Sequence, residues 1–306
     1  MSAIDSSRKR LVVTGANGFV AGSVLSQAGR DWQVHGVSRG GAPGSRENLC
    51  WHTCDPQAPG ALARLLHEIR PEAVIHTAAI ADIDVCQAQP ELARAVNVNF
   101  TRMLAEVCAE TESKLVFCST DTIFDGEHAP YSEADVPGPV NLYAETKVEA
   151  EQLVSQLGAQ AVIARLSLVV GLPVLGAGNS SLARMIVTLQ QGRTVAVPGC
   201  EVRTPLDVIT AGRALLELAA GDHSGIYHLA GHTRVNRFEM ACAIAVRFGF
   251  PRDLILDQGV ATTPGRAPRP RDVSLDNRKA CTLLNTPMQT LDEGLSLILE
   301  VAHPKP

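Results

Sequence analysis

The stretch "RLVVTGANGFVAGSVL", residues 10–25, joins a short apolar run to a helix-like segment through a turn that contains two glycines. Gly15 and Gly18 follow the run directly, where glycine lets the backbone turn sharply and approach a pyrophosphate bound by helix N–H groups. The place of a third glycine is taken by Ala21, which is small enough for close packing of helix on strand. We therefore predict a dinucleotide site at this turn. The residues assigned to it are Gly15, Asn17, Gly18, Phe19 and Val20.

The alternation of apolar run and amphipathic segment continues through the first half of the chain. The expected strands are 10–14, 32–38, 48–52, 73–77, 114–119 and 161–166, and the expected helices are 19–28, 59–69, 90–110 and 143–157. Strands that are continuously apolar and are each followed by a helix indicate a parallel sheet that is covered on both faces. We predict an α/β fold with a doubly wound parallel Rossmann sheet.

The alternation weakens after Arg165, and turn-forming residues accumulate in 171–181 and 262–272. Helices are still expected at 208–220 and 236–248. We therefore predict a dinucleotide-binding Rossmann domain over 1–168 and a smaller, loop-rich domain over 169–306 that mainly binds the substrate. Some segments of the second part, such as 204–230, could pack back onto the Rossmann domain.

Composition excludes several functions. The chain has 306 residues, 45% of them apolar and 19% charged, which is enough to bury a large core. A formal net charge of −5 without any lysine-rich run gives no surface for phosphate backbones, so we predict no nucleic-acid partner. No apolar run approaches the roughly 20 residues that span a bilayer, and the N-terminus shows no signal sequence. We therefore expect no membrane contact and a cytoplasmic location.

The eight cysteines are scattered through apolar stretches, and we expect them to be reduced thiols. Cys50 and Cys54 could suggest a metal-binding pair. They are four residues apart across an expected strand, however, and no second pair lies near them, so packing is the better interpretation. We predict no metal site.

The end of the second expected strand selects between the two nicotinamide dinucleotides. An acid there, about 20 residues after the glycines, would bind the free ribose 2′-hydroxyl of NAD(H). The chain instead has "VSRGG", in which Ser38 and Arg39 offer a hydroxyl and a forked guanidinium that suit a 2′-phosphate. We predict a preference for NADP(H), with NAD(H) still possible. The alternative for Arg39 is a solvated loop residue.

A second motif, "NLYAETKVEA" at 141–150, places Tyr143 four residues before Lys147. Residues at this spacing share one helix face, and Asn141 is a suitable N-cap, so the two side chains should project together from the start of a helix. A free tyrosine has a pKa of about 10, and a neighbouring ammonium group lowers the pKa toward neutrality. The pair therefore predicts proton exchange with a carbonyl or an alcohol.

The stretch "FCSTDTIFDG", residues 117–126, ends the fifth expected strand with Ser119 and Thr120, and either hydroxyl could orient a carbonyl. Together with the glycine turn and the tyrosine–lysine pair, this pattern resembles the extended short-chain dehydrogenase/reductase family over nearly the whole chain. The stretch "VIHTAAIADIDVCQAQPELARAVNVNFT" is similar to the fourth strand and following helix of that family. The resemblance implies further cofactor-site residues: the backbone at Ala78 and Ala79, a supporting Asn97, and Asp55 against the adenine.

Within this family the chain most resembles the dTDP-4-dehydrorhamnose reductase group. The resemblance is carried by "CSTDTIFDGEHAPYSEADVPGPVNLYAETKVEAE", by "RTPLDV" at 203–208 and by "RPRDVSLD" at 269–276. It implies the reduction of a keto group on a nucleotide-activated sugar. In that reaction Thr120 orients the carbonyl, Tyr143 donates the proton, and the cofactor supplies the hydride. Lys147 holds the nicotinamide ribose and lowers the pKa of the tyrosine.

Two residues depart from the relatives. Thr122 stands where the reductase group usually has a tyrosine near the sugar, and both Asp121 and Thr122 are assigned to the substrate site. The related dehydratases have an Asp-Glu pair after the threonine. The pair Asp121-Thr122 lacks the second carboxylate, which argues against dehydration. Epimerisation stays an alternative because it uses the same threonine, tyrosine and lysine.

Arginines in the second part could clamp a diphosphate bidentately. The candidates are Arg203, Arg266, Arg269 and Arg271, of which Arg203 and Arg269 are assigned to substrate binding. The alternative for each of them is a surface or interdomain position. Asp207 is expected to stabilise a turn or an interdomain contact.

A non-catalytic function is the main competing hypothesis. The chain also resembles the regulatory β-subunit of methionine adenosyltransferase in the "FDG" region, in "LYAETK" and in "EMACAIAVRFGFP" at 239–251. This resemblance implies an NADP-binding regulatory subunit that acts on a partner protein. A reductase of a non-sugar carbonyl is a further alternative, and a homodimer is left open.

Overall fold

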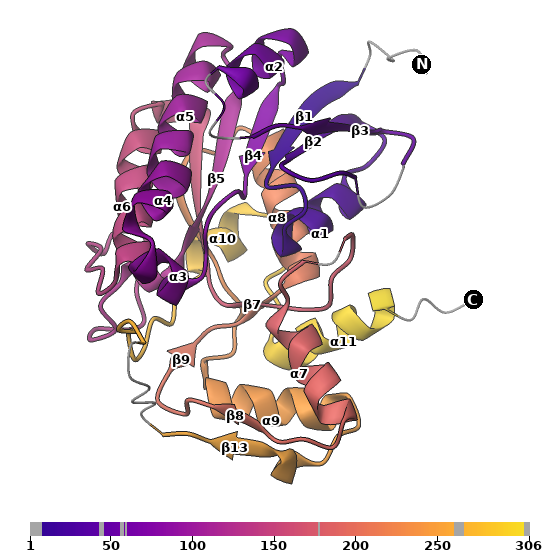
Figure 1. The fold of residues 1–306 in the computed structure, drawn as a ribbon, viewed down its shortest axis with the longest axis vertical. Coiled ribbons are helices and arrows are strands. Elements are labelled where there is room, and N and C mark those ends of the chain that lie inside the picture. Colours follow the sequence, from indigo (N-terminus) through magenta and orange to yellow (C-terminus); the bar gives the residue numbers. More distant parts are fainter. Residues whose placement is uncertain are drawn as a thin grey trace.

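Seven parallel strands form the central sheet of the protein (Figure 1). The computed structural model describes residues 8–42, 46–55, 58, 60–176, 178–259 and 266–302. The strands are β1 (Lys9–Thr14), β2 (Trp32–Ser38), β3 (Leu49–Thr53), β4 (Ala73–His76), β5 (Lys114–Thr120), β6 (Ala161–Leu166) and β11 (Gly225–Leu229). They lie in the order β11-β6-β5-β4-β1-β2-β3, and all neighbours run parallel. The order reverses between β1 and β4, which is where such sheets bind ligands.

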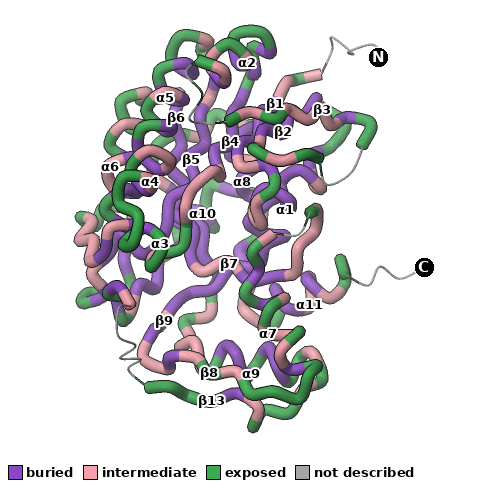
Figure 2. Tube along the Cα trace, viewed as in Figure 1, coloured by how far each residue is buried: buried purple, intermediate pink, exposed green. Residues whose placement is uncertain are grey.

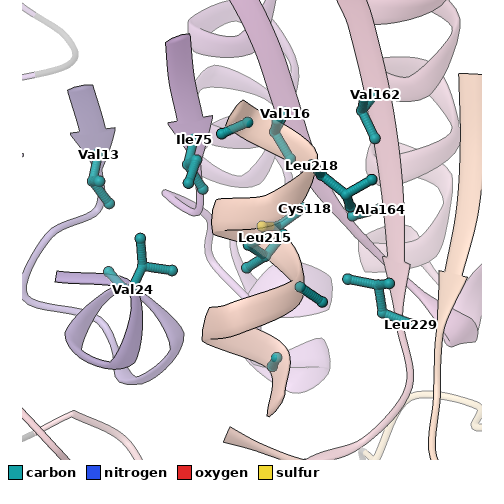
Figure 3. Packing of buried hydrophobic residues seen from close by; sticks show 14 of the residues in the cluster. Val13, Val24, Ile75, Val116, Cys118, Val162, Ala164, Leu215, Leu218 and Leu229 are labelled. Carbon is teal, nitrogen blue, oxygen red and sulfur yellow. The ribbon is translucent and has the colours of Figure 1, made fainter. Parts of the chain in front are cut away.

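Helices cover both faces of this sheet. One layer consists of α2 (Ala61–Ile69), α5 (Phe100–Glu110) and α6 (Leu142–Ser155), and the other contains α1 (Phe19–Gln27) and α8 (Val208–Ala220). Side chains of β5 alternate between the layers: Phe117 packs with the first, whereas Val116 packs with Leu215 of α8 (Figure 3). Except for the edge strand β3, the strands are therefore buried along most of their length (Figure 2), which explains why apolar residues dominate most of their sequences. The predicted doubly wound parallel α/β fold is confirmed.

The six predicted strands correspond to β1 to β6, each within one residue of its expected ends. The helix expected over 90–110 is instead divided. The chain there forms α4 (Pro90–Arg94), the π-helical segment η1 (Ala95–Asn99) and α5, and the short helix α3 (Ile83–Ala88) precedes them. The spacing of apolar residues does not predict the π-helical turn. Asn97 in this turn bonds through its side chain to the backbone of Ile80, and such a contact leaves no mark on the hydrophobic pattern. Single π-helical turns often occur at functional sites.

The second half of the chain returns to the sheet through α8 and β11. Helix α8 packs directly on α1, where Ser23 donates a hydrogen bond to the backbone oxygen of Val208 at 2.6 Å. A Cβ on Gly212 would lie 2.6 Å from the Ser23 hydroxyl, so glycine is needed for the two helices to approach this closely. Both α8 and β11 lie within the segment 204–230 and pack on α1 and β6, respectively. We propose the domain boundary near residue 168, with this returning segment belonging to the sheet half.

The remaining elements gather beside the sheet, below it in Figure 1. Three small sheets pair β7 (Val169–Val170) with β10 (Leu206–Asp207), β9 (Val202–Arg203) with β12 (Val235–Asn236), and β8 (Val195–Val197) with β13 (Ile255–Asp257). The helices of this part are α7 (Ser181–Gln190), α9 (Arg237–Arg247) and α11 (Leu291–Ala302), and α10 (Arg278–Leu283) packs against β11. Separate apolar clusters fill this part, with Leu182, Ile244 and Ile298 in one of them.

All eight cysteines are free thiols, and Cys50 accepts a hydrogen bond from Gln33 at 3.3 Å. Within the described ranges, no three metal-ligating side chains gather in one place. None of the helices in the described part of the chain has the length and apolar character needed to cross a membrane.

Candidate active site

Two adjoining cavities open at the carboxyl ends of the central strands. The first, of about 440 Å³, is the glycine-turn cavity, bordered by Gly15, Gly18 and Arg39. The second, of about 540 Å³, is the tyrosine cavity, bordered by Thr120 and Tyr143 among others. Thr77 and Ala79 line both, so a single extended ligand could occupy the two together.

The turn after β1 is built for close approach of backbone and ligand. Gly15 has a φ of +70°, and a Cβ there would lie 2.7 Å from both the Cα and the N of Ala78. Gly18 is the N-cap of α1 and donates its N–H to the Gly15 carbonyl at 2.7 Å. The two predicted residues after it, Phe19 and Val20, line the tyrosine cavity instead of the glycine-turn cavity. The start of α1 therefore lies where the two cavities meet.

Replacing Gly15 by alanine is expected to weaken nicotinamide dinucleotide binding about tenfold or more. The new Cβ adds a backbone clash to an unfavourable positive φ, and strain of about 1–3 kcal/mol falls on the turn that holds the ligand. Fluorescence titration of the cofactor measures the change. Gly29→Ala is the matched control, because a Cβ there meets nothing within 4 Å. Equal affinity in the Gly15 variant and wild type would contradict this account of the turn.

The end of β2 meets the glycine turn through side chains. Asn17 donates to the Ser38 hydroxyl at 3.1 Å, and that hydroxyl donates to the Gly40 carbonyl at 2.8 Å. Arg39 is exposed and lines the glycine-turn cavity, as does Cys54 after β3. Asp55 follows Cys54 at the surface. The predicted selector residues therefore lie at the rim of the cavity that the glycine turn borders.

Thr120, Tyr143 and Lys147 lie around the same cavity, although they come from two elements. Thr120 is the last residue of β5, and α6 begins one residue before Tyr143. Asn141 caps α6 by accepting the Ala144 N–H at 2.9 Å, as predicted. The tyrosine and lysine are 9% and 2% exposed, so both are almost removed from water at the cavity wall.

Burial dominates the electrostatics of this pair. It raises the pKa of Tyr143, with Asp121 acting in the same direction, while a hydrogen bond with Thr120 lowers that pKa. Burial lowers the pKa of Lys147 to about 8. The Lys147 ammonium donates to the Cys118 carbonyl at 2.7 Å and lies 4.0 Å from the centre of the Phe117 ring. Burial therefore decides the direction of the shift, and the raised pKa leaves Tyr143 protonated at neutral pH.

Asn97 supports the site from inside the π-helical segment. Its side chain accepts the Ile80 N–H at 2.8 Å, donates to the Ile80 carbonyl at 3.1 Å and donates to the Thr146 hydroxyl at 3.0 Å. Thr146 in turn donates to the Tyr143 carbonyl at 2.7 Å. One amide therefore joins the loop after β4 to the first turn of α6. Ala78 and Ala79, just before Ile80, line the glycine-turn cavity as expected.

Further polar groups follow Thr120 in the tyrosine cavity. The Thr122 hydroxyl lies 3.0 Å from the Thr120 hydroxyl, and both line the cavity. Asp121 is buried, which raises its pKa, and the nearby Arg203 guanidinium opposes this shift with Nε 3.7 Å from Oδ2. The Ser119 hydroxyl is buried at the cavity without a partner among the described residues. Both hydroxyls that end β5, those of Ser119 and Thr120, therefore face the tyrosine cavity.

Part of the wall of the tyrosine cavity is rich in arginine. Those that line it are Arg184, Arg203, Arg237, Arg266 and Arg269. Glu201, only 3% exposed, lies among them, with carboxylate oxygens 2.8 Å from Arg266, 3.4 Å from Arg237 and 3.7 Å from Arg203. Sequence reasoning missed Glu201, Arg184 and Arg237, because no local motif marks them.

Three other predicted polar residues of the second half differ in their surroundings. Arg269 forms an ion pair with Asp84, and Arg271 is exposed outside the described lining of the cavity. Asp207 is the N-cap of α8 and accepts the Thr210 N–H at 2.8 Å, which agrees with the structural role expected for it.

Two known proteins are similar to this chain in sequence over most of its length. Methionine adenosyltransferase 2 subunit beta of Xenopus laevis is 32% identical over 286 residues, which cover 89% of this chain and 81% of that protein. The probable low-salt glycan biosynthesis reductase Agl14 of Haloferax volcanii is 32% identical over 291 residues, 94% of this chain and 96% of that protein.

A solved structure shares the fold. The dTDP-4-dehydrorhamnose reductase of Bacillus anthracis, in complex with NADP, superposes with a TM-score of 0.83 at 23% identity, covering 95% of this chain and 99% of that one. A family model described as the RmlD substrate binding domain matches residues 9–303. The chain therefore belongs to the RmlD substrate binding domain family, within the extended short-chain dehydrogenase/reductases, a class of NAD(P)-dependent oxidoreductases.

Proposed function

We propose that the protein is an NADPH-dependent reductase of a keto group on a nucleotide-activated sugar, similar to dTDP-4-dehydrorhamnose reductase. One observation carries the proposal: Thr120, Tyr143 and Lys147 line the same cavity, of about 540 Å³, as a cluster of arginines. The first group suits a carbonyl and the arginines suit phosphate groups. The reductase Agl14, which is similar over nearly its whole length, supports the same class of reaction.

The charge of the tyrosine cavity fits a dianion. Its described lining has six cationic side chains and four carboxylates, which leaves an excess of two positive charges. The diphosphate of a nucleotide sugar carries two negative charges near neutral pH. Guanidinium groups bind phosphate oxygens through two parallel hydrogen bonds, so an arginine wall also matches the geometry of this group.

The glycine turn fits a dinucleotide, because a Cβ at Gly15 would fill the space beside Ala78 where the backbone must stay open. Asn17, Gly18, Ser38 and Arg39 would hold its adenosine end in the glycine-turn cavity. When bound, a nicotinamide dinucleotide supplies the hydride. Lys147, whose ammonium already donates to a backbone carbonyl, would bind its ribose hydroxyls.

Two side chains of the protein would orient the substrate carbonyl and protonate its oxygen. Thr120 orients the substrate carbonyl by donating its hydroxyl hydrogen, and Tyr143 gives its phenolic proton to the carbonyl oxygen as the C–H bond forms. Because burial raises the pKa of Tyr143, the tyrosine is in its acid form at neutral pH, which the reductive direction requires.

The cofactor preference gives a direct test of Arg39. Replacing Arg39 by glutamine is expected to weaken NADPH binding roughly 10- to 100-fold, since charge-assisted hydrogen bonds to the 2′-phosphate are lost. NADH binding should be unchanged, because NADH has no 2′-phosphate. The measurement is fluorescence titration of both cofactors, with the exposed Arg30→Gln as a control for net charge. An equal loss for the two cofactors would contradict the selector role.

The experiment that tests the proposed function follows NADPH absorbance with a panel of 4-keto sugar nucleotides. Oxidation by the wild-type protein that is absent in Tyr143→Phe would support the reductase. Tight NADPH binding without oxidation of NADPH by any substrate would contradict it. That result, together with copurification of a second protein, would favour a regulatory subunit, an alternative favoured by the 32% identity to the methionine adenosyltransferase subunit.

A further inference from the structure

Residues 266–270, here called the wall segment, close one side of the tyrosine cavity, because Arg266 and Arg269 both line it. The segment comes from the second half of the chain but is fastened to α3. The Asp84 carboxylate accepts the Ala267 N–H at 2.9 Å and both terminal nitrogens of Arg269 at 2.7 Å each. Three hydrogen bonds thus join elements about 185 residues apart in sequence.

The wall segment has two further attachments. Asn141, the N-cap of the helix that carries Tyr143, donates to the Pro268 carbonyl at 3.0 Å. At the other end Arg266 donates to Glu201 at 2.8 Å, within the arginine cluster. The segment therefore spans the cavity from the tyrosine helix to the cationic wall, and Figure 1 shows it as the yellow-orange loop close to α3.

The guanidinium of Arg269 is already committed to protein partners. Its fork is matched to both oxygens of Asp84, and one nitrogen also donates to the Ala267 carbonyl at 2.6 Å. The side chain is 13% exposed. Arg269 holds the pKa of Asp84 down at about 2, so the pair stays charged over the whole working range of pH. A ligand phosphate would have to displace a bidentate carboxylate to bind this arginine.

We propose that Asp84 and Arg269 are positioning residues that clamp the wall segment to the cofactor half and thereby hold Arg266 where the substrate diphosphate binds. This inference rests on the proposed function and replaces the direct substrate contact expected of Arg269. Binding energy at the diphosphate then depends on an ion pair that does not touch it. Asp84 and Arg269 do not line the glycine-turn cavity, so the contacts that the cofactor makes in that cavity are expected to be kept.

The test compares Asp84→Asn, Arg269→Met and the double variant, with Arg271→Met as a matched control from the exposed position two residues on. Each single variant is expected to raise KM for the keto sugar nucleotide, and Kd for the probe dTDP, about 5- to 30-fold. The double variant should have about the same KM and Kd as either single variant, because each substitution alone already breaks the Asp84–Arg269 ion pair. In these variants the kcat at saturating substrate and the Kd for NADPH should equal those of the wild-type protein. Arg271→Met should match the wild type in all of these constants.

Direct binding of phosphate by Arg269 gives the opposite pattern for Asp84→Asn. That variant would free the arginine and leave dTDP binding equal or tighter, while Arg269→Met alone would weaken it. This result, or full additivity of the two substitutions, would overturn the clamp.

Hydrogen exchange at the Ala267 amide separates the clamp from the proposed function. The amide should exchange faster in both single variants and stay protected in Arg271→Met. Unchanged exchange would overturn the clamp, whatever the activity. A wild-type protein that binds neither dTDP nor any keto sugar nucleotide would contradict the proposed function itself, and with it the role given to the wall segment in substrate binding.

Discussion

Replacing Tyr143 by phenylalanine is expected to lower kcat by roughly 10²- to 10⁴-fold, the usual contribution of a positioned general acid. The substitution removes one hydroxyl and keeps the ring, which packs with Cys86 and Ala93. NADPH affinity should change little, because the contacts of the glycine turn and Lys147 remain. Stopped-flow or steady-state measurement of NADPH oxidation at saturating substrate gives kcat, and a separate titration gives Kd.

The matched control is Tyr227→Phe on β11. That side chain is also buried, at 3% exposure, and its hydroxyl lies 3.2 Å from His223, but it is outside the described lining of either cavity. It should keep wild-type kcat. If the Tyr143 variant also retained wild-type kcat, the proton would come from another group, and the role given to this tyrosine would be wrong.

Replacing Arg165 by methionine is expected to lower the free energy of unfolding by about 3–5 kcal/mol. Arg165 on β6 donates to Glu151 of α6 through Nε, at 3.1 and 3.2 Å, and through Nη2 at 2.8 Å. The two side chains are 3% and 7% exposed, so the substitution leaves a carboxylate buried without its partner. Glu151 lies one turn after Lys147, and the loss falls on the helix that carries the tyrosine and the lysine. Urea denaturation with an unchanged m-value measures it.

Two controls separate this charge effect from a simple loss of volume. Arg94→Met breaks an exposed ion pair between Arg94 of α4 and Glu149 of α6, whose side chains are 45% and 42% exposed. It should lower the free energy of unfolding by less than about 1 kcal/mol. Adding Glu151→Leu to Arg165→Met should recover much of the loss, because no buried charge is left. A double variant as unstable as Arg165→Met alone would show that packing, not charge, explains the effect.

The sheet could be predicted from the sequence because its physical cause is local. Strands covered on both faces are rich in apolar residues, and the segment 161–166 is apolar at every position except Arg165. The start of α6 could also be predicted from the sequence, because the Asn141 cap bonds to a residue only three positions away. The seventh strand was predicted only as part of a returning segment. Its sequence, "GIYHL", is short and begins at the surface, so only the parallel pairing with β6 reveals it.

The part of the site that could not be predicted depends on contacts between distant segments. Asp84 meets Arg269 and Glu201 meets Arg266 only after the chain has folded, and a single charged residue in a loop gives no sign of its partner. Burial is also a property of the fold. Desolvation raises the pKa of Tyr143, whereas the tyrosine–lysine spacing led us to expect a lower pKa.

The contact between α1 and α8 limits the order in which parts of the chain can fold during synthesis. A nascent chain that has emerged to residue 168 contains the whole glycine turn and six of the seven strands. The face of α1 that meets Gly212 and Val208 is then still uncovered, and β6 is still an open edge. Contacts between segments so far apart in sequence form slowly, and uncovered strand edges invite aggregation. The half that holds the cofactor turn is thus synthesised first but completed late, after residue 229 has left the ribosome.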